Sequence, residues 1–250
     1  MINNLKENII QICRLIYAKG FVSATDGNVS VRIQNSSNIL TTSTGVNKGL
    51  IESEDIIEID LNGNVISGNK KPSTEIAMHL FIYNQRQDVN AVVHAHPPYA
   101  TGFATARQDL TGCLYPEVII GLGAIPLADY ATPSTIEVVK SIEPFVHKTE
   151  AILLANHGVV TYGKDLLDAY FKLEKVEHTA HITFIARLLG GEKYLSKEDI
   201  EKLKLISETT YGKNFLEKLS CTPSENMSSN LKNNISEEDI RRFIKEILGK

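Results

Sequence analysis

The sequence predicts an α/β fold: a single domain whose mixed, largely antiparallel central sheet is flanked by helices. Strand-like runs cluster early in the chain, and Asn62-Gly63 between two of them is a typical hairpin turn. Helical and strand-like segments then follow without the strict β-α-β alternation of a parallel sheet. A chain of 250 residues is also long enough to bury one sizeable core.

The individual elements follow from apolar periodicity and capping residues. The first expected helix is residues 5–19, whose apolar side chains share one face and which Gly20 closes. Ser73 or Thr74 is expected to cap a helix that ends near Tyr83. Further helices are expected at residues 99–106, 134–146, 166–189 and 198–210. Strands are expected at residues 28–33, 39–42, 56–61, 65–66, 91–96, 118–120, 125–126 and 152–155.

The composition is that of an ordinary water-soluble enzyme or binding protein. Hydrophobic residues make up 42% of the chain and charged residues 22%, and the formal net charge is -4. No basic face of the kind that binds nucleic acid is indicated. No apolar run approaches the ~20 residues that a membrane-spanning helix needs, and the first residues do not resemble a signal peptide. We therefore expect a cytoplasmic protein without nucleic-acid or membrane partners.

The cysteines indicate the redox environment. Cys13, Cys113 and Cys221 are odd in number, far apart in the chain, and not arranged as Cys-x-x-Cys. This pattern predicts three free thiols in a reducing cytoplasm rather than a disulfide framework.

Three histidines stand at the ends of two apolar runs. His94 and His96 end the run 91–96, whose β-branched valines indicate a strand, so their side chains are expected on the same face. His157 ends a second run and precedes Gly158, which permits a sharp exit of the chain. A histidine at a strand end is usually structural, but three imidazoles together suit Zn²⁺ and leave one coordination position open. We therefore predict one zinc site.

Three short segments have the composition of anion-binding loops, namely residues 25–30, 42–45 and 71–75. Their glycines let the backbone approach a ligand closely. Their hydroxyls, an asparagine amide and the N–H groups at a helix start can donate to a phosphate. Each segment alone more often marks a turn or a helix cap. Beside a metal site, the three together predict a phosphate pocket.

The composition changes after Leu219. Residues 220–235 are rich in Ser and Asn and are predicted to form a flexible linker. Residues 236–250 place their apolar side chains on one face and are predicted to form an amphipathic helix. A helix this short is marginal alone in water, so its apolar face needs a surface to cover. The main domain is therefore expected at residues 1–219.

Five motifs, in this order, resemble the class II aldolase family, the family of L-fuculose-1-phosphate aldolase and L-ribulose-5-phosphate 4-epimerase. They are Gly27-Asn28-Val29-Ser30, Ser43-Thr44-Gly45, Pro72-Ser73-Thr74-Glu75, His94-Ala95-His96 and Asn156-His157-Gly158. The resemblance covers about residues 5–215 and implies that residues 1–219 form the catalytic domain. Five motifs in the family's order are specific for the superfamily and less specific for one substrate.

The resemblance also implies roles for individual residues. His94, His96 and His157 match the zinc ligands, and Glu75 matches the carboxylate that acts as base. The residues that match the substrate-phosphate site are Gly27, Asn28, Thr44, Gly45, Ser73 and Thr74. Tyr115 matches a tyrosine that protonates the departing aldehyde oxygen from a neighbouring subunit, and Tyr211 resembles a C-terminal tyrosine that faces the substrate. Both tyrosines have an alternative interpretation as ordinary surface or core aromatics. The family implies a homotetramer with sites between subunits.

The expected activity is zinc-dependent cleavage of a ketose 1-phosphate. L-Fuculose 1-phosphate is the preferred substrate, with dihydroxyacetone phosphate and lactaldehyde as products. Glu75 favours cleavage, since the epimerases of this family carry an aspartate at the matching position. Pro133 stands where the fuculose enzyme is expected to have an aromatic, which bears on the aldehyde specificity. The alternatives are the L-ribulose-5-phosphate 4-epimerase, an aldolase or dehydratase of 5-deoxy- or methylthio-pentulose 1-phosphate, and an adducin-like module without catalysis.

The tail adds an expectation about location. A polar linker that ends in a short amphipathic helix resembles the encapsulation peptides of bacterial microcompartments. Such shells confine toxic aldehydes, so an enzyme that releases lactaldehyde is plausible cargo. The alternative is a terminal helix that packs against its own tetramer.

Overall fold

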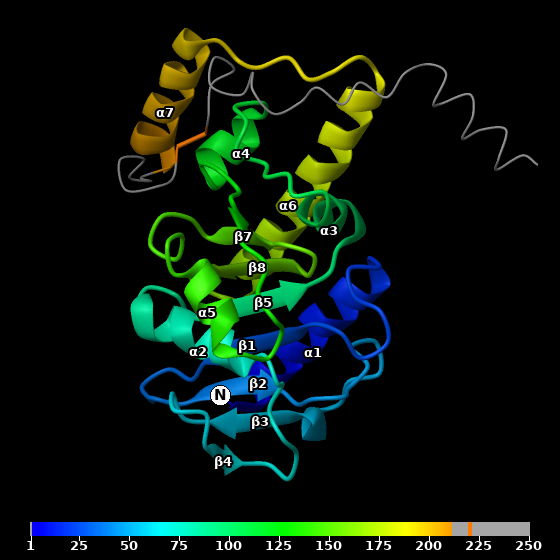
Figure 1. Ribbon diagram of the computed structural model, residues 1–250. Helices are drawn as coiled ribbons and strands as arrows, with labels where there is room; N and C mark the ends of the chain where they lie inside the picture. Colours follow the sequence, from blue (N-terminus) through cyan, green and yellow to red (C-terminus); the bar gives the residue numbers. More distant parts are fainter. Residues whose placement is uncertain (1, 212–219, 222–250) are drawn as a thin grey trace, which may run out of the picture.

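The computed structural model describes residues 2–211 and 220–221. Its centre is an eight-stranded sheet with the order β4-β3-β2-β1-β5-β8-β7-β6 (Figure 1). Neighbouring strands are antiparallel, except that β6 and β7 are parallel. Helices cover both faces, so the predicted α/β fold with a mixed, largely antiparallel sheet is confirmed.

The bounds of the elements are as follows. The strands are β1 (Asn28–Arg32), β2 (Ile39–Thr42), β3 (Ile56–Ile59), β4 (Val65–Ser67), β5 (Ala91–Ala95), β6 (Leu127–Ala128), β7 (Ala151–Leu154) and β8 (Gly158–Gly163). The helices are α1 (Ile2–Ala18), α2 (Ile76–Gln85), α3 (Pro98–Thr105), α4 (Pro116–Gly121), α5 (Ile136–Ile142), α6 (Leu166–Leu188) and α7 (Lys197–Tyr211), with a 3₁₀ turn at Ser53–Asp55.

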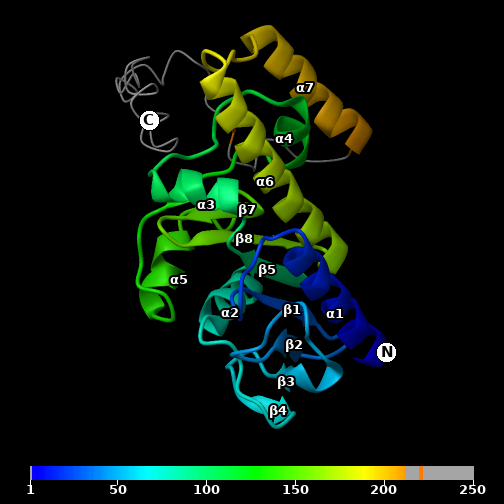
Figure 2. The ribbon, with the colours of Figure 1, turned by 90° about the vertical axis from the view of Figure 1, so that its right-hand side faces the viewer.

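Two hydrophobic cores lie on the two faces of the sheet. One is shared with α1, α3 and α6, and the other with α2 and α5 (Figure 2). Strand β5 contributes to both, because Ala91, Val93 and Ala95 belong to the first core and Val92 to the second. By the same alternation, His94 points to the face that α2 covers. The packing of β5 between the two cores therefore determines the face of the sheet on which the His94 side chain lies.

Two expected strands differ from the structure. Residues 118–120 are part of helix α4, which begins at Pro116 with Tyr115 as its N-cap. Proline at the first helical position pre-sets the helical φ, and packing of α4 against α7 outweighs the β-propensity of its valine and isoleucines. The strand expected at residues 125–126 begins at Leu127 instead, while Ile125 forms an isolated bridge with Leu110.

The hydroxyl residues before α2 do not cap it. The N-cap position is Glu75, and no side chain caps the helix there. The expectation that Ser73 or Thr74 is the N-cap is therefore wrong. The Ser73 hydroxyl instead accepts a hydrogen bond from the Glu75 backbone N–H, at 3.3 Å. Both hydroxyl residues lie in the turn that precedes the helix.

The cysteine prediction is wrong for two of the three residues. Cys113 and Cys221 are both buried and form a disulfide across 108 residues of sequence. They meet in a small apolar cluster with Ile119 and Ile200, which brings together segments that are remote in the chain. Sequence spacing does not reveal such a meeting. Cys13 is a buried free thiol as expected, and burial raises its pKa to about 12.

This disulfide gives a first testable prediction. In denaturant, a thiol reagent should detect one cysteine per chain before reduction and three after it. Cys221→Ser should lower the free energy of unfolding by about 2–4 kcal/mol, since the cross-link restricts a long loop in the unfolded chain. Cys13→Ser would leave the cross-link intact and serves as the control. Three reactive thiols before reduction would contradict the disulfide.

The expected linker and terminal helix are mostly outside the described residues. Of residues 220–235 only Ser220 and Cys221 are described, and residues 236–250 are not. Among the described helices, none combines the length and the apolar character that crossing a bilayer requires.

Candidate metal and substrate site

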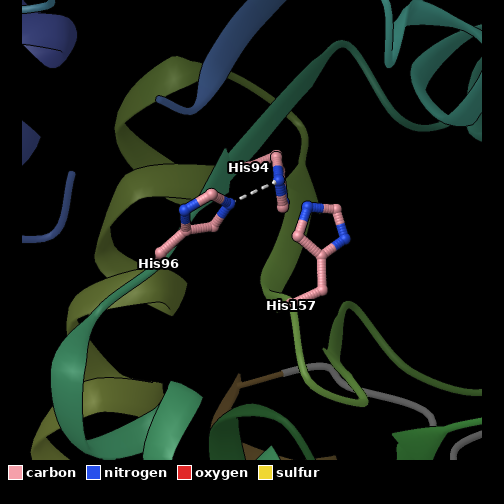
Figure 3. Close-up of side chains that lie close together, drawn as sticks. All are labelled: His94, His96 and His157. Carbon is pink, nitrogen blue, oxygen red and sulfur yellow. Dashed lines mark hydrogen bonds between the residues drawn. The ribbon is translucent and has the colours of Figure 1, made fainter. Parts of the chain in front are cut away.

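Three imidazoles meet at one end of the sheet. His94 is on β5, His96 follows that strand, and His157 lies in the turn between β7 and β8 (Figure 3). Their ring centroids are 4.7 to 5.1 Å apart, and one possible ligand atom from each ring lies within 4.8 Å of the others. The three histidines that the sequence singles out are therefore brought together.

The hydrogen bond of His94 sets the direction of its ring. Its Nδ1 lies 2.9 Å from the Val159 carbonyl oxygen, which can only accept, so Nδ1 carries the proton. The Nε2 lone pair then faces His96, whose Nε2 is 3.2 Å away. A histidine that donates from one nitrogen to a carbonyl and offers the other is the usual arrangement of a metal ligand. Sequence alone does not reveal the Val159 contact, because it depends on pairing of β5 with β8.

The second histidine is electrically suited to the same role. Burial, together with neighbouring His94 and His157, lowers the pKa of His96 to about 4. The ring is therefore neutral near pH 7, which is the form that binds metal ions. Its Nδ1 lies 3.7 Å from a carboxylate oxygen of Asp26. Asp26 stands in the first anion-binding segment, and no local sequence pattern predicts its position beside a histidine.

The donor set fits a metal ion. Three imidazole nitrogens converge, each from a rigid strand or a tight turn, and three protein ligands leave a position for water or substrate. The turn itself is built differently from the expectation. Asn156 has the positive φ, +55°, while Gly158 is needed because a Cβ there would come within 2.5 Å of the Ala95 carbonyl oxygen. Gly158 is therefore required for the close approach of β8 to β5, and not for a sharp turn of the chain after His157.

A carboxylate lies directly beside the cluster. The Glu75 oxygens are 3.3 Å from His94 Nε2 and 3.0 Å from His157 Nε2. Asn28 donates an amide hydrogen bond to Glu75 at 3.1 Å. Burial would raise the pKa of Glu75, but the attraction and close contacts of His94 and His157 together lower it below its ordinary value. The side chain is therefore an ionised carboxylate held at the metal cluster.

The three anion-binding segments meet at this end of the sheet. Asn28 donates to the Ser73 hydroxyl at 3.2 Å, which links the first segment to the third. The Thr44 N–H donates to the Lys71 carbonyl at 3.0 Å, which links the second to the third. Ser134 donates to the Thr74 hydroxyl. The candidate phosphate residues Gly27, Asn28, Thr44, Gly45, Ser73 and Thr74 therefore occupy one continuous region.

Buried polar side-chain atoms in this region lack hydrogen-bond partners. Within the described part of the chain they include the Asn28 side-chain oxygen Oδ1, the Ser43 hydroxyl and Glu75 Oε1. Leaving such a group unpaired costs about 1–3 kcal/mol, so native proteins rarely do so without a reason. A polar ligand bound beside the carboxylate would satisfy them.

Gly27 has a specific structural reason to be glycine. Its φ is +72°, and a Cβ would lie 2.8 Å from the His94 carbonyl oxygen and 2.6 Å from Val22 Cγ1. The residue therefore lets the first anion-binding segment lie directly against the metal-binding strand.

The close approach at Gly27 gives a second prediction. Gly27→Ala should lower the free energy of unfolding by about 2–4 kcal/mol, as positive φ and overpacking each contribute. Gly20 is the matched control, because its φ is +70° but no atom lies within 4 Å of a Cβ there. Gly20→Ala should cost about 1 kcal/mol. Urea unfolding measures both, and equal losses would contradict the close-approach argument.

The two tyrosines are not placed at the cluster. The Tyr115 hydroxyl lies 3.2 Å from the Thr183 hydroxyl on α6. Tyr115 also lines a cavity of about 840 Å³ with Tyr99 and His181, and none of the three clustered histidines lines it. Tyr211 is the last residue of α7, and its side chain lies outside the described part of the structure. Within one chain, the structure does not bring Tyr115 to the three-histidine cluster.

Known proteins are similar to this chain in both sequence and fold. A family model described as the class II aldolase and adducin N-terminal domain matches residues 7–184. An L-fuculose phosphate aldolase of Methanococcus maripaludis is 39% identical over 71% of this chain and 95% of its own length. A 5-deoxy-D-ribulose 1-phosphate aldolase of Bacillus thuringiensis is 29% identical over 79% of this chain and 91% of its own.

A solved structure agrees. An L-fuculose 1-phosphate aldolase superposes with a TM-score of 0.72 at 33% identity, covering 80% of this chain and 94% of the other. The family is generally metal-dependent, in keeping with the three-histidine cluster. The chain therefore belongs to the class II aldolase family and is an enzyme of the lyase class.

Proposed function

We propose that the protein is a zinc-dependent aldolase that cleaves L-fuculose 1-phosphate to dihydroxyacetone phosphate and lactaldehyde. The observation that carries the proposal is the position of Glu75. Its carboxylate contacts two of the three clustered histidines and the amide of Asn28, which in turn bonds Ser73. A base, a metal-binding cluster and an anion-binding region are thus adjacent, as the chemistry of a phosphorylated ketose requires.

In this proposal His94, His96 and His157 hold the zinc ion. When bound, zinc supplies a Lewis acid that draws electron density from the carbonyl oxygen of the ketose. Three protein ligands would leave a coordination position for the substrate. The hydrogen bond from His94 to the Val159 carbonyl holds that ring in its metal-binding tautomer.

Glu75 is the proposed catalytic base. In the condensation direction, its carboxylate removes a proton from the carbon of dihydroxyacetone phosphate that will form the new bond. In cleavage, the same side chain returns the proton to that carbon. The ionised state that its surroundings favour is the state that can accept a proton. The Asn28 amide holds one oxygen in place, which orients the group.

The phosphate is proposed to lie among Gly27, Asn28, Thr44, Gly45, Ser73 and Thr74. Support comes from the hydrogen bonds that connect the three segments and from the buried Ser43 hydroxyl, which has no partner among the described residues and can donate. Backbone N–H groups and hydroxyls would donate to the phosphate oxygens. The phosphate group itself does not react, but its binding positions the reacting carbons of the substrate. It therefore raises kcat as well as the affinity for the substrate.

Tyr115 is proposed to complete the site of a neighbouring subunit in a homotetramer. The support is that Tyr115 lines a cavity that none of the three clustered histidines of its own chain lines. From there its side-chain oxygen would take the proton of the substrate hydroxyl that becomes the aldehyde in cleavage, and would give that proton to the aldehyde oxygen in condensation. Tyr211 is proposed as a further contact to the substrate.

Residues 236–250 are proposed to direct the enzyme into a bacterial microcompartment, with residues 220–235 as linker. The amphipathic pattern of apolar residues in this part of the sequence supports the assignment. Deleting residues 222–250, which spares the disulfide at Cys221, should preserve aldol cleavage but abolish co-purification with shell proteins. Equal shell recovery with and without the segment would rule it out.

Product analysis tests the activity. The zinc-loaded protein is incubated separately with L-fuculose 1-phosphate, 5-deoxy-D-ribulose 1-phosphate and L-ribulose 5-phosphate. Dihydroxyacetone phosphate and lactaldehyde from the first, with the highest kcat/KM, are expected. Faster cleavage of the second would move the assignment toward the activity named for the Bacillus thuringiensis relative. An isomer from the third would indicate an epimerase, and a diketone product from a pentulose phosphate would indicate a dehydratase.

A further inference from the structure

A lysine is buried beneath the candidate site. Lys48 is only 1% exposed, although its side chain ends in an ammonium group. Its Nζ donates to the Val46 carbonyl at 2.7 Å and to the Thr25 carbonyl at 3.2 Å. Fully buried lysines are rare, because the charge loses its hydration. A lysine that is kept in a buried position despite this cost is a candidate for a functional role.

Opposing influences act on the pKa of Lys48. Burial lowers the pKa of Lys48, and nearby Asp26 and Asp55 act in the opposite direction. Cys13 is also close, but burial raises the pKa of its thiol to about 12, so it is neutral and does not balance the charge. Asp55 is already paired with Lys70. The direct contacts of the ammonium are therefore two backbone carbonyls.

Those two carbonyls belong to different halves of the site. Thr25 begins the first anion-binding segment, which continues through Asp26 beside His96 to Asn28 beside Glu75. Val46 directly follows Thr44 and Gly45 of the second segment. Because Lys48 donates to both carbonyls, it sets the distance between two loops. One loop holds Thr25 and lies next to the three-histidine cluster, and the other holds Val46 and lies next to the proposed phosphate. It also places a positive charge under the same two loops.

We propose that Lys48 is a positioning residue that shapes the anion pocket and makes the enzyme select phosphorylated over unphosphorylated substrates. The proposal rests on the proposed function and extends it to a residue outside the family motifs. Lys48 touches neither the substrate nor the metal, and it acts through the two loops that it joins. Removing it lets the loops separate and deletes a charge that attracts the phosphate.

A second buried lysine provides a matched control. Lys172 is 8% exposed and bonds Asp168, Glu150 and the Tyr162 carbonyl. These contacts lie at the far end of β8 from Gly158, where the strand leaves the site. A lysine that matters only for stability should behave like Lys172.

The experiment compares Lys48→Met with Lys172→Met in the full-length, zinc-loaded enzyme. Calorimetry measures the Kd of inorganic phosphate. Condensation with lactaldehyde measures kcat/KM for dihydroxyacetone phosphate and for unphosphorylated dihydroxyacetone. For Lys48→Met we expect phosphate Kd to rise at least tenfold, and the preference for the phosphorylated donor to fall at least tenfold, with zinc content unchanged. For Lys172→Met both quantities should stay within twofold of the wild type, whatever its loss of stability.

Lys48→Gln is a second variant for the case that Lys48→Met does not fold. It keeps an N–H donor at this position and removes only the charge and one contact. It should raise phosphate Kd at least fivefold. An unchanged phosphate Kd and an unchanged donor preference in either folded Lys48 variant would overturn the proposal. A wild-type enzyme that itself shows no phosphate binding and no preference for the phosphorylated donor would instead overturn the proposed phosphate site, and this inference with it.

Discussion

Replacing His157 with alanine is expected to lower kcat/KM for the ketose phosphate by a factor on the order of 10³ or more. The reason is loss of one of three nitrogen donors that lie within 4.8 Å of one another. Lewis-acid stabilisation is worth several kcal/mol, and about 1.4 kcal/mol corresponds to a tenfold change in rate. Steady-state kinetics and metal analysis after dialysis measure the effect. Zinc content should fall well below one ion per chain.

The control for this variant is His147→Ala. His147 is a surface histidine that bonds Gln85, away from the cluster. It should keep full zinc content and kcat/KM within twofold of the wild type. Full zinc occupancy and full activity in His157→Ala would show that the third histidine is structural.

Glu75→Gln is expected to lower kcat by a factor of about 10²–10⁴ while zinc remains bound, because the amide keeps the shape of the side chain but cannot accept the proton. The hydrogen bond from Asn28 can still form to the remaining carbonyl oxygen. Rapid-quench or coupled assays of aldol cleavage measure kcat. Exchange of a carbon-bound proton of dihydroxyacetone phosphate with deuterated water, followed by NMR, isolates the step assigned to Glu75.

The matched control for the carboxylate is Glu58→Gln. Glu58 is also partly buried and accepts a hydrogen bond from an asparagine, Asn38, at 2.6 Å, but it lies on β3. Its substitution should leave kcat and proton exchange within twofold. If Glu75→Gln exchanged protons at the wild-type rate, another group would have to be the base.

The strand that carries His94 and leads directly into His96 could be predicted from local sequence. The valines before His94 indicate a strand, and its period of two predicts that His94 and His96 project together. Their contact with His157 could not be derived in this way. It depends on pairing of β5 with β8, in which Ala95 lies opposite Val159. Local patterns carry no information on which strands pair across such a separation. The place of His157 at the end of an apolar run makes it a candidate ligand, but does not show that it meets the other two histidines.

Errors arose where long-range packing outweighed local preference. Val118 and Ile119 favour a strand by propensity, but Pro116 and burial against α7 make a helix. The run that forms β8 was passed over, although its β-branched residues carry a strand signal. Lys48 was missed because a lysine in a polar loop is normally solvated. Its burial is visible only once the two loops are placed together.

Zinc-edge X-ray absorption of the metal-loaded enzyme tests the central claim most directly, namely that one ion is held by imidazoles from β5 and from the β7–β8 turn. We predict one zinc per chain with a first shell of nitrogen and oxygen near 2.0–2.1 Å and outer-shell scattering that fits three imidazoles. His157→Ala, loaded at excess zinc, should fit two. A wild-type spectrum with fewer than three imidazoles, or one that His157→Ala leaves unchanged, would contradict the account.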